Sequence, residues 1–333
     1  MPGWVSRIVS AFEARPSPEL QSRQRQPRRQ GLDDLAAVLR RDYFPTFSHY
    51  TEEYLNTAEG QEDFENHLYR RLELDRRLII PWLDHALPLT GASVLEIGCG
   101  TGSGTLAMAE QGAIVTALDV NPRHLDVART RCAVYGVEAQ FVAANATEAR
   151  ATTAGKLFDF VIFFASLEHM TYGERLRTIA ETFELVRPGG LWGVIEAPNR
   201  LWPYDSHTSH LPFFHWLPDE IAITYRRYSP RRELTEDVMD PGSASGAMSL
   251  ARWGRGVSFH EFDLALCPAE QLDVRSSLGQ FVTQRNVVRR VFGRFRKDYR
   301  TREWLRRFAG RGLHPGFFEP YLHLLIRRPT ERR

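Results

Sequence analysis

The chain of 333 residues is long enough for one large domain with extensions or for two modest domains. Hydrophobic residues make up 43% of it and charged residues 25%, which is ordinary for a soluble globular protein. The 43 basic and 41 acidic residues give a net charge of +2, so the overall charge gives no reason to expect a nucleic-acid partner. Cys99, Cys132 and Cys267 lie far apart, which excludes a disulfide framework and a cysteine-based zinc module.

Features near the beginning of the sequence favour a cytoplasmic protein. No apolar run approaches the ~20 residues that cross a bilayer, and the first residues lack the apolar core of a signal peptide. Residues 1–30 are basic and rich in Arg, Pro and Gln, so we expect a disordered tether. Residues 31–90 have helical periodicity and predict an N-terminal helical segment.

Short apolar runs and amphipathic helices alternate between residues 91 and 200. This order predicts an α/β domain in which helices cover both faces of a parallel sheet. Asn121 and Pro122 form a good helix start, and Pro188–Gly190 predicts a turn before the fifth strand. The five expected strands are Val94–Ile97, Ile114–Leu118, Ala139–Val142, Phe160–Phe164 and Leu191–Ile195.

Residues 201–333 are expected to complete this domain on its acceptor side. The sequence is less regular here, and we assign its parts by composition and periodicity. The expected parts are an ordered loop at 201–218, a flexible connection at 240–256, a strand at 257–266, a basic helix at 285–308 and a final strand at 321–326.

A glycine-rich loop follows the first expected strand. Gly98, Gly100 and Gly102 allow a sharp turn and a close approach of the backbone to a ligand. Asp119 ends the next strand about twenty residues on, where a carboxylate accepts hydrogen bonds from ribose hydroxyls. A dinucleotide fingerprint, G-x-G-x-x-G, fails at Ser103. Glu96 would repel a pyrophosphate and suits a cationic ligand with an amino group.

The segment from Glu96 to Gly102 resembles motif I of the class I S-adenosylmethionine-dependent methyltransferases, E-x-G-C-G-x-G. Residues 118–122, 158–169 and 187–190 are similar to three further motifs of that superfamily. The likeness is closest to its small-molecule and lipid branch, which includes quinone-biosynthesis enzymes. It implies a Rossmann-like fold over roughly residues 90 to 200, with S-adenosylmethionine as co-substrate.

The resemblance also implies roles for residues at the ends of the strands. The departure at position 145, where many relatives have an aspartate, leaves an amide that can still accept a hydrogen bond. The implied residues are Glu96, Gly98, Cys99 and Gly100 around the methionine part, Asp119 on the ribose, Val120 on the adenine, Asn145 on the adenine amino group, and Ala165 and Ser166 at the methyl-bearing end.

Candidates for the acceptor chemistry follow the fourth and fifth strands. His207 and His210 are the preferred general bases, with Asp205 as an orienting carboxylate. His169 either contacts substrate or is structural. Two alternatives remain for the loop, namely a packed aromatic loop and a metal site formed by Asp205, His207 and His210. Since the spacing indicates no fourth ligand, no metal is expected. His260 and Glu261, on the expected strand at 257–266, are further candidates.

The basic stretch 285–307 predicts an amphipathic helix, because Val288, Val291, Phe295 and Tyr299 recur at helical spacing. Such a helix either contacts an anionic membrane surface or packs on the core with a solvated outer face.

These features favour O-methylation of a sugar, glycolipid or other secondary metabolite, with a histidine as base. C-methylation of a lipid-like ring and a non-catalytic S-adenosylmethionine-binding subunit are the alternatives. No motif indicates a nucleic-acid substrate, and the sequence leaves the oligomeric state open.

Overall fold

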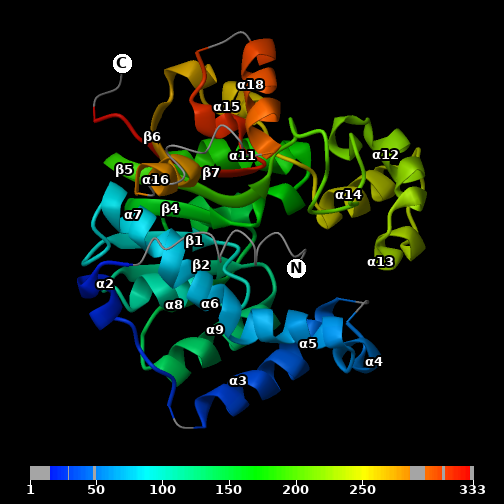
Figure 1. Cartoon of the computed structure of the whole chain (residues 1–333). Helices are drawn as coiled ribbons and strands as arrows, with labels where there is room; N and C mark the ends of the chain where they lie inside the picture. The colour runs from blue at the N-terminus through cyan, green and yellow to red at the C-terminus, as the bar shows by residue number, and fades with distance from the viewer. Residues whose placement is uncertain (1–15, 29, 48–49, 286–296, 310–311, 331–333) are drawn as a thin grey trace. The chain divides into compact units, whose positions relative to one another are not determined.

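The computed structural model describes residues 16–28, 30–47, 50–285, 297–309 and 312–330 (Figure 1). Its seven-stranded sheet has the order β3-β2-β1-β4-β5-β7-β6. The α/β fold expected from the sequence is therefore confirmed. Among the described residues, no helix has the length and apolar character needed to cross a bilayer. The strands are β1 (Ser93–Ile97), β2 (Ile114–Asp119), β3 (Gln140–Ala143), β4 (Phe158–Phe164), β5 (Val186–Pro198), β6 (Asp273–Ser277) and β7 (Tyr321–Arg327).

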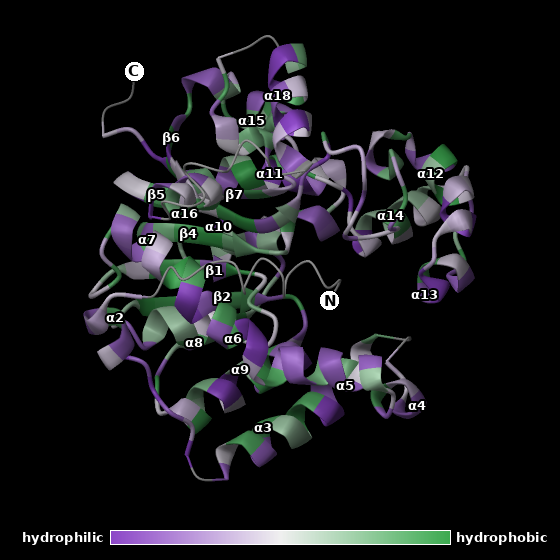
Figure 2. Cartoon of the chain, viewed as in Figure 1, coloured by the Kyte–Doolittle hydropathy of each residue, from purple (hydrophilic) through white to green (hydrophobic). Residues whose placement is uncertain are grey.

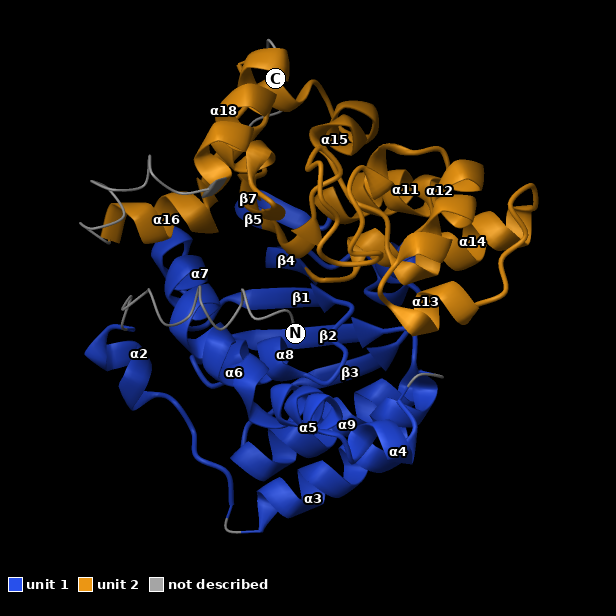
Figure 3. Ribbon diagram, turned by 45° about the vertical axis from the view of Figure 1, so that its right-hand side comes forward, with its two compact units in different colours: residues 1–163, 185–191 blue, residues 164–184, 192–333 orange. Residues whose placement is uncertain are grey.

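The chain divides into two compact units (Figure 3). Unit 1 comprises Met1–Phe163 and Leu185–Leu191, and unit 2 comprises Phe164–Glu184 and Trp192–Arg333. The boundary passes through β4 and β5, so it differs from the expected division at residues 30, 90 and 200.

In unit 1, β1 pairs in parallel with both β2 and β4, and β2 pairs in parallel with β3. Side chains of β1 and β4 are almost entirely buried, and in Figure 2 these strands carry the hydrophobic colour. Helices α8 (Ser103–Ala109) and α9 (Pro122–Tyr135) follow β1 and β2. The side chain of Asn121 caps α9 and Gly136 ends it at φ 66°, as the sequence predicts for the start of this helix.

Helices also form most of the described chain before β1. Three single π-helical turns interrupt the helical run, and a local cluster of Leu and Phe side chains is buried beneath it. The elements are α2 (Pro18–Ser22), α3 (Gly31–Val38), η1 (Leu39–Tyr43), η2 (Phe44–Thr46), α4 (Glu52–Leu55), α5 (Ala58–Glu65), η3 (Asn66–Arg70), α6 (Arg71–Leu74), η4 (Asp75–Ile79) and α7 (Ile80–Ala86).

The described part of the expected tether is more ordered than its composition suggests. Ser17 caps α2, and Leu20 is buried. The backbone carbonyl of Leu20 also accepts a hydrogen bond from the Gln111 side chain. A single apolar side chain and a capped turn thus dock this segment in unit 1. Residues 1–15 and 29 lie outside the described residues.

A fully buried arginine of α9 joins the N-terminal helices to the glycine loop. The Arg131 guanidinium donates to the carbonyls of Thr101 at 2.7 Å, Leu68 at 2.8 Å and His67. Burial lowers the pKa of Arg131 to about 10, so the side chain is charged at neutral pH. Buried carbonyls that need donors are thereby satisfied by one side chain.

Unit 2 contains the antiparallel pair β6 and β7 and a group of helices with its own apolar core. Strand β7 confirms the final strand expected from the sequence, whereas the polar strand β6 was not anticipated. The helical elements are η6 (Leu167–His169), α11 (Tyr172–Phe183), η7 (Phe214–Trp216), α12 (Asp219–Tyr225), η8 (Arg226–Tyr228), α13 (Arg232–Glu236), α14 (Ala244–Trp253), α15 (Phe259–Ala265), η9 (Ala269–Gln271), α16 (Leu278–Arg285), α18 (Lys297–Ala309) and η11 (Pro315–Phe318). Short η5 (Ala146–Glu148) and α10 (Ala149–Thr152) belong to unit 1.

Three sequence expectations in the second half of the chain are wrong. Most of residues 257–266 form helix α15, and only Val257 makes an isolated β-bridge, because Ser258 and Glu261 make a capping box that starts a helix. The stretch 240–256, expected to be flexible, contains α14, which Ser243 caps. Pro188–Gly190 lies within β5, where a Cβ on Gly190 would come within 2.7 Å of the Asp159 carbonyl oxygen.

A second buried arginine organises unit 2. Arg175, on α11, pairs with Glu261 at 2.8 Å and donates to the carbonyls of Leu167 at 3.1 Å, Gly256 at 3.0 Å and Arg255 at 3.0 Å. It therefore ties the turn that follows β4 to the segment that precedes α15.

Candidate active site

The glycine loop that follows β1 has the backbone conformation that its sequence suggests. Gly98 and Gly100 have φ values of 77° and 51°, in the left-handed region that favours glycine. The backbone N–H groups of Gly98 and Cys99 both donate to the Leu118 carbonyl, at 2.8 Å and 3.0 Å. The N–H of Gly100 donates to Oδ2 of Asp119 at 2.8 Å. A hydrogen bond therefore joins the glycine loop directly to the carboxylate at the end of β2.

The surface above Gly100 is open. A Cβ placed on Gly100 would meet no heavy atom of the described residues within 4 Å, whereas one on Gly102 would lie 2.7 Å from the Ala128 Cβ. Gly102 thus serves helix packing, and Gly100 leaves a cradle that a ligand can fill. Val120, directly after Asp119, is 71% exposed, so its apolar side chain is available to pack on a ligand ring.

Asp119 is buried and keeps further acceptor capacity. Its Oδ1 accepts from the N–H of Asn121 at 2.9 Å, in addition to the bond from Gly100. A carboxylate offers about four acceptor positions, so two remain for hydroxyl groups of a ligand. The Nδ1 atom of His124 lies 3.7 Å from Oδ1.

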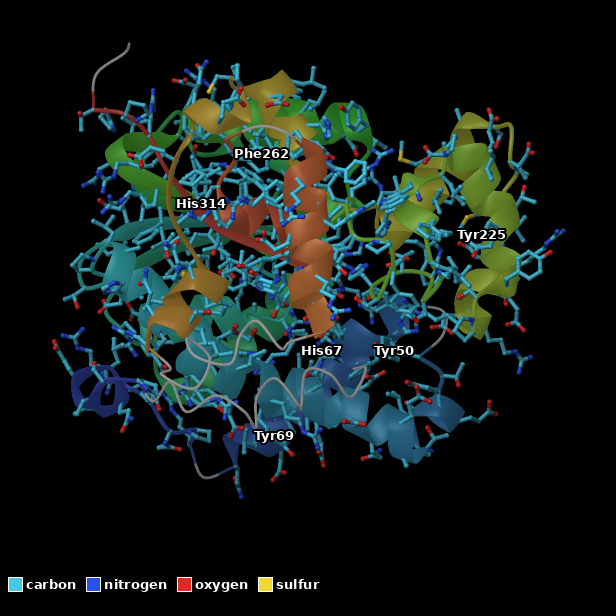
Figure 4. All side chains as sticks on the ribbon, turned by 45° about the horizontal axis from the view of Figure 1, so that its top comes forward. Tyr50, His67, Tyr69, Tyr225, Phe262 and His314 are labelled. Atoms are coloured by element: carbon cyan, nitrogen blue, oxygen red, sulfur yellow. The ribbon has the colours of Figure 1, made fainter. Side chains whose placement is uncertain are left out.

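An aromatic group beside His124 was missed at the sequence level. The ring centroid of Tyr43 lies 5.0 Å from that of His124 and 4.4 Å from that of His67, while Phe47 stacks on His124 at 5.9 Å. Figure 4 labels His67 and Tyr50, and Phe44 contacts both. The density of aromatic residues between positions 43 and 50 was the available signal, although only the fold brings them next to Asp119.

Glu96 points into the interior of unit 1. It is almost completely buried on β1, and its Oε2 accepts a hydrogen bond from the Thr105 hydroxyl. Burial raises the pKa of Glu96 to about 8, and the Thr105 bond opposes this rise. Glu96 is therefore protonated at neutral pH in the free protein. A bound ammonium group would favour the ionised carboxylate, so Glu96 would lose its proton when a cationic ligand binds.

The expected role of Asn145 is less compatible with its contacts. Its Oδ1 accepts from the N–H and the hydroxyl of Thr147, both at 3.0 Å. These bonds use both lone pairs of the oxygen in capping η5. The contact of Asn145 with an adenine amino group stays a prediction that requires this cap to rearrange.

In unit 2, Ala165 begins the turn after β4 with a φ of 41°, which is rare for a residue with a side chain. Its N–H donates to the Ile195 carbonyl at 2.9 Å, and the residue after Ile195, Glu196, has a φ of 62°. Strained backbone thus occurs directly after β4 and two residues before the end of β5, and such strain often accompanies a functional site. Ser166 separates Ala165 from η6, and the methyl-side roles of these two residues stay predictions.

Asp205 organises the loop after β5 and does not orient the His207 ring. It is buried, and its two oxygens accept from the backbone N–H groups of His207 and Thr208 at 2.9 Å and of Ser209 at 2.6 Å. Two side chains also contact the carboxylate: the Ser209 hydroxyl donates to Oδ2 at 2.8 Å, and Nε2 of His215 lies 3.0 Å from Oδ1. Although burial opposes it, the nearby His215 and these N–H groups lower the pKa of Asp205.

His207 instead faces the turn after β4. Its Nε2 lies 3.8 Å from Oε1 of Glu168, and the Nε2 of His169 lies 3.9 Å from the same oxygen. Burial lowers the pKa of His207 to about 3, and it also lowers the pKa of His169. Both rings are therefore neutral at pH 7. Glu168 was quoted in the sequence only as part of a motif, and its partner His207 could not be identified without the fold.

The remaining histidine candidates lie outside this group. His210 is half-buried at a φ of 55°, and burial lowers its pKa. His260 is exposed on α15 and stacks on Phe259. Glu261 is fully committed to its capping box with Ser258 and its ion pair with Arg175, so it has a structural role.

Residues 94–190 match the family model described as a methyltransferase domain. This segment is a methyltransferase domain. The resemblance deduced from the glycine loop and Asp119 is thereby confirmed for the part of the chain that carries those residues.

Curated relatives of the methyltransferase domain include two ubiquinone biosynthesis O-methyltransferases. The protein of Aromatoleum aromaticum is 39% identical over 113 residues, which are 34% of this chain and 47% of that protein. The protein of Thiobacillus denitrificans is 34% identical over 123 residues, which are 37% of this chain and 51% of that protein. The chain therefore spans about half the length of the curated relatives it matches.

Among solved structures, the chain is similar to magnesium protoporphyrin IX methyltransferase of Synechocystis PCC 6803, crystallised with bound SAM. The two are 20% identical with a TM-score of 0.36, over 50% of this chain and 78% of the other. The part of this chain that follows the methyltransferase domain, including His207, lies beyond the residues matched by the family model.

The buried Glu96 predicts a specific pH dependence of the stability of the methyltransferase domain. The folded protein keeps a proton on Glu96 up to about pH 8, whereas the unfolded chain releases it near the ordinary value of 4.5. The free energy of unfolding should therefore fall as the pH rises from 4.5 to 8, and Glu96→Gln should reduce this fall by at most ~1.4 kcal/mol per pH unit.

Denaturant unfolding at a series of pH values measures this effect. Glu138→Gln is the matched control, because Glu138 is an exposed glutamate of the same unit. Identical pH profiles for the wild type and Glu96→Gln would contradict a protonated Glu96.

Proposed function

We propose that the chain is an S-adenosylmethionine-dependent methyltransferase that methylates an oxygen atom of a small-molecule acceptor. The observation that carries this proposal is the bond from the Gly100 N–H to Asp119 beneath an open cradle, within a segment that matches the methyltransferase domain. The curated relatives, named as O-methyltransferases, support an oxygen acceptor.

The cofactor would use three features of unit 1. The ribose hydroxyls would donate to the two acceptor positions left on Asp119. The adenine would pack on the exposed Val120. The ammonium group of the methionine part would favour the ionised form of Glu96, so cofactor binding would release a proton below about pH 8.

The acceptor would be a sugar, a glycolipid or another secondary metabolite, with an apolar or ring face. The loop after β5 supports this class, because Tyr204, Phe213 and Trp216 are exposed there and the rings of Phe213 and Trp216 lie 5.0 Å apart. Exposed aromatic side chains suit such a face. Isolation of a C-methylated product would instead favour the alternative of a lipid-like ring.

The reaction is a displacement at the methyl carbon. An oxygen lone pair of the acceptor forms the new O–C bond, and the C–S bond breaks with its electron pair left on sulfur, giving S-adenosylhomocysteine. The hydroxyl proton must leave, and positioning of the two reactants supplies most of the remaining acceleration. We propose that the group formed by Glu168, His169 and His207 promotes the loss of this proton.

Cofactor binding gives the first test. Asp119→Ala should weaken the binding of S-adenosylmethionine by ~1.5–3 kcal/mol, since hydrogen bonds to a charged group are lost. Calorimetry measures the affinity, and NAD should not bind. Asp126→Ala is the control, because Asp126 pairs only with Arg129 on the exposed face of α9 in the described contacts. Unchanged affinity in Asp119→Ala would overturn the ribose assignment.

The acceptor side gives the second test. On a hydroxylated acceptor that the wild type methylates, His207→Ala should lower the rate by ~10²–10⁴ and leave cofactor affinity unchanged. His210→Ala, three residues away and outside the group with Glu168, should retain most of the rate. If both variants keep full activity, the loop after β5 is structural. If no acceptor is methylated while cofactor binds, the non-catalytic alternative is favoured.

We further propose that α18 contacts an anionic membrane surface. Of the stretch 285–307, residues 286–296 lie outside the described residues, including Val288, Val291 and Phe295. Helix α18 is basic and presents Trp304 and Phe308, which are 46% and 73% exposed with ring centroids 4.6 Å apart. Aromatic residues among arginines suit the interface of an anionic bilayer.

Vesicle co-sedimentation tests this contact. Binding to phosphatidylglycerol vesicles should be strong at low salt and fall sharply at high salt, because the attraction is screened. The double variant Trp304→Ala and Phe308→Ala should lose most of the binding. Replacement of Tyr228, an aromatic residue of unit 2 that is 60% exposed, should have no effect. Absence of binding at low salt would leave α18 with a packing role only.

A further inference from the structure

Three side chains of unit 2 each offer one atom that could bind a metal ion. The side chains are those of Glu168, His169 and His207, whose ligand atoms all lie within 4.8 Å of one another. The Nε2 atoms of His169 and His207 lie 3.9 Å and 3.8 Å from Oε1 of Glu168. Glu168 and His169 come from η6, directly after β4, and His207 comes from the loop after β5. Within the described residues this is the group of histidine and acidic side chains whose atoms could share one metal ion.

Hydrogen bonds determine which ring nitrogens carry protons. The Nδ1 of His169 lies 2.8 Å from the Arg252 carbonyl oxygen, which can only accept. The Nδ1 of His207 lies 3.0 Å from the Thr208 hydroxyl oxygen, and that hydroxyl donates to the Gly254 carbonyl at 2.7 Å. Both Nδ1 atoms therefore donate, and in the neutral rings each Nε2 bears a lone pair.

Two nitrogen lone pairs thus face one buried carboxylate oxygen. Metal-binding histidines show this arrangement, in which the second ring nitrogen donates to a carbonyl or hydroxyl group and fixes the ring. We propose that Glu168, His169 and His207 bind one divalent first-row transition-metal ion. Two imidazoles and one carboxylate suit Zn²⁺, Fe²⁺ or Co²⁺ and leave coordination positions open.

The separations are close to those of a formed site. Ligand atoms about 2.1 Å from a tetrahedral Zn²⁺ lie about 3.4 Å apart. The distances from the two Nε2 atoms to Oε1 of Glu168, 3.8 Å and 3.9 Å, exceed this value by about 0.5 Å, which a small side-chain rotation removes. The ion would be accessible through His169, whose side chain is 40% exposed.

The backbone around the ligands is fixed by long-range contacts. The carbonyl of Glu168 accepts from the N–H of Arg255 at 2.8 Å, and the carbonyl of His169 accepts from the Arg252 side chain at 2.8 Å. At Gly254, whose φ is 112°, a Cβ would lie 2.9 Å from the Cε1 of His207. A glycine is thus required for the main chain to approach the ring and accept from Thr208. Such support is what a metal site needs in order to hold its geometry.

The inference rests on the proposed function and specifies its acceptor side. An acceptor hydroxyl would occupy an open coordination position, and the ion would lower the pKa of that hydroxyl, as zinc does for bound water. Its proton would pass to solvent, and the oxygen would then form the O–C bond as the C–S bond breaks. In this scheme the two histidines are ligands, and neither is the general base.

Metal binding is measured on the full chain after removal of metal with a chelator. Titration with Co²⁺, followed by its visible absorption and by calorimetry, should show one ion bound per chain. Glu168→Gln, His169→Ala and His207→Ala should each weaken binding by at least about 10-fold. His260→Ala is the control, because His260 is an exposed histidine of the same unit, and its binding should equal that of the wild type.

Thr208→Val keeps all three ligands and removes the acceptor for the His207 Nδ1 proton, together with the bond from the Thr208 hydroxyl to the Gly254 carbonyl. It should weaken Co²⁺ binding by roughly 10- to 100-fold. If the loop has only a structural role, this substitution should leave the Co²⁺ affinity unchanged. Absence of Co²⁺ binding by the wild type, or equal binding by the wild type and all four variants, would overturn the proposal. S-adenosylmethionine affinity is measured in parallel. Its loss in Asp119→Ala tests the methyltransferase proposal separately, because Asp119 lies in unit 1 and outside the metal group.

Discussion

Buried guanidinium groups that donate to backbone carbonyls are the interaction on which the two halves of the proposed chemistry depend. Arg131 in unit 1 and Arg175 in unit 2 are each almost fully buried, and most of their partners are main-chain oxygens. A charged donor forms stronger hydrogen bonds than a neutral one, and a planar group with five N–H donors can reach several carbonyls at once. Loops without regular hydrogen bonding can be held in this way.

Each arginine fixes a loop that carries candidate functional residues. Arg131 binds the carbonyl of Thr101 in the glycine loop and so connects that loop to the N-terminal helices. Arg175 binds the carbonyl of Leu167, immediately before Glu168 and His169. In both cases the arginine binds a backbone carbonyl of the loop. The side chains that would contact a ligand are therefore not needed for this anchoring contact.

The sequence predicted well those features that depend on neighbouring residues. The order of strands and helices through β5, the cap of α9 by Asn121 and the coupling of the glycine loop to Asp119 all depend on local patterns. The capping box at Ser258 was also local and readable. It was missed because alternating residues at 258–262 were interpreted as a strand, although Phe259 and Phe262 have helical spacing.

The contacts that define the acceptor side could not be predicted in the same way. His207 lies 39 positions after Glu168 in the sequence, and the loop after β5 has no regular periodicity from which the pairing could be derived. Asp205 has histidine neighbours at positions 207 and 210, and yet the histidine ring that contacts its carboxylate is that of His215. Burial and long-range pairing decide such contacts, and single-sequence patterns carry little information on either.

The histidines of unit 2 show why residue type alone does not assign a role. In His215, Nδ1 accepts from the N–H of Gly256 at 3.2 Å and Nε2 lies 3.0 Å from Oδ1 of Asp205, so both ring nitrogens face groups of the loop and of the segment before α15 and the ring is structural. In His207 the roles of the two ring nitrogens differ. Nδ1 donates a hydrogen bond to the Thr208 hydroxyl oxygen, which leaves the Nε2 lone pair directed at Glu168. The partners of the two ring nitrogens thus separate a histidine that completes the loop from one that can bind a metal ion or an acceptor.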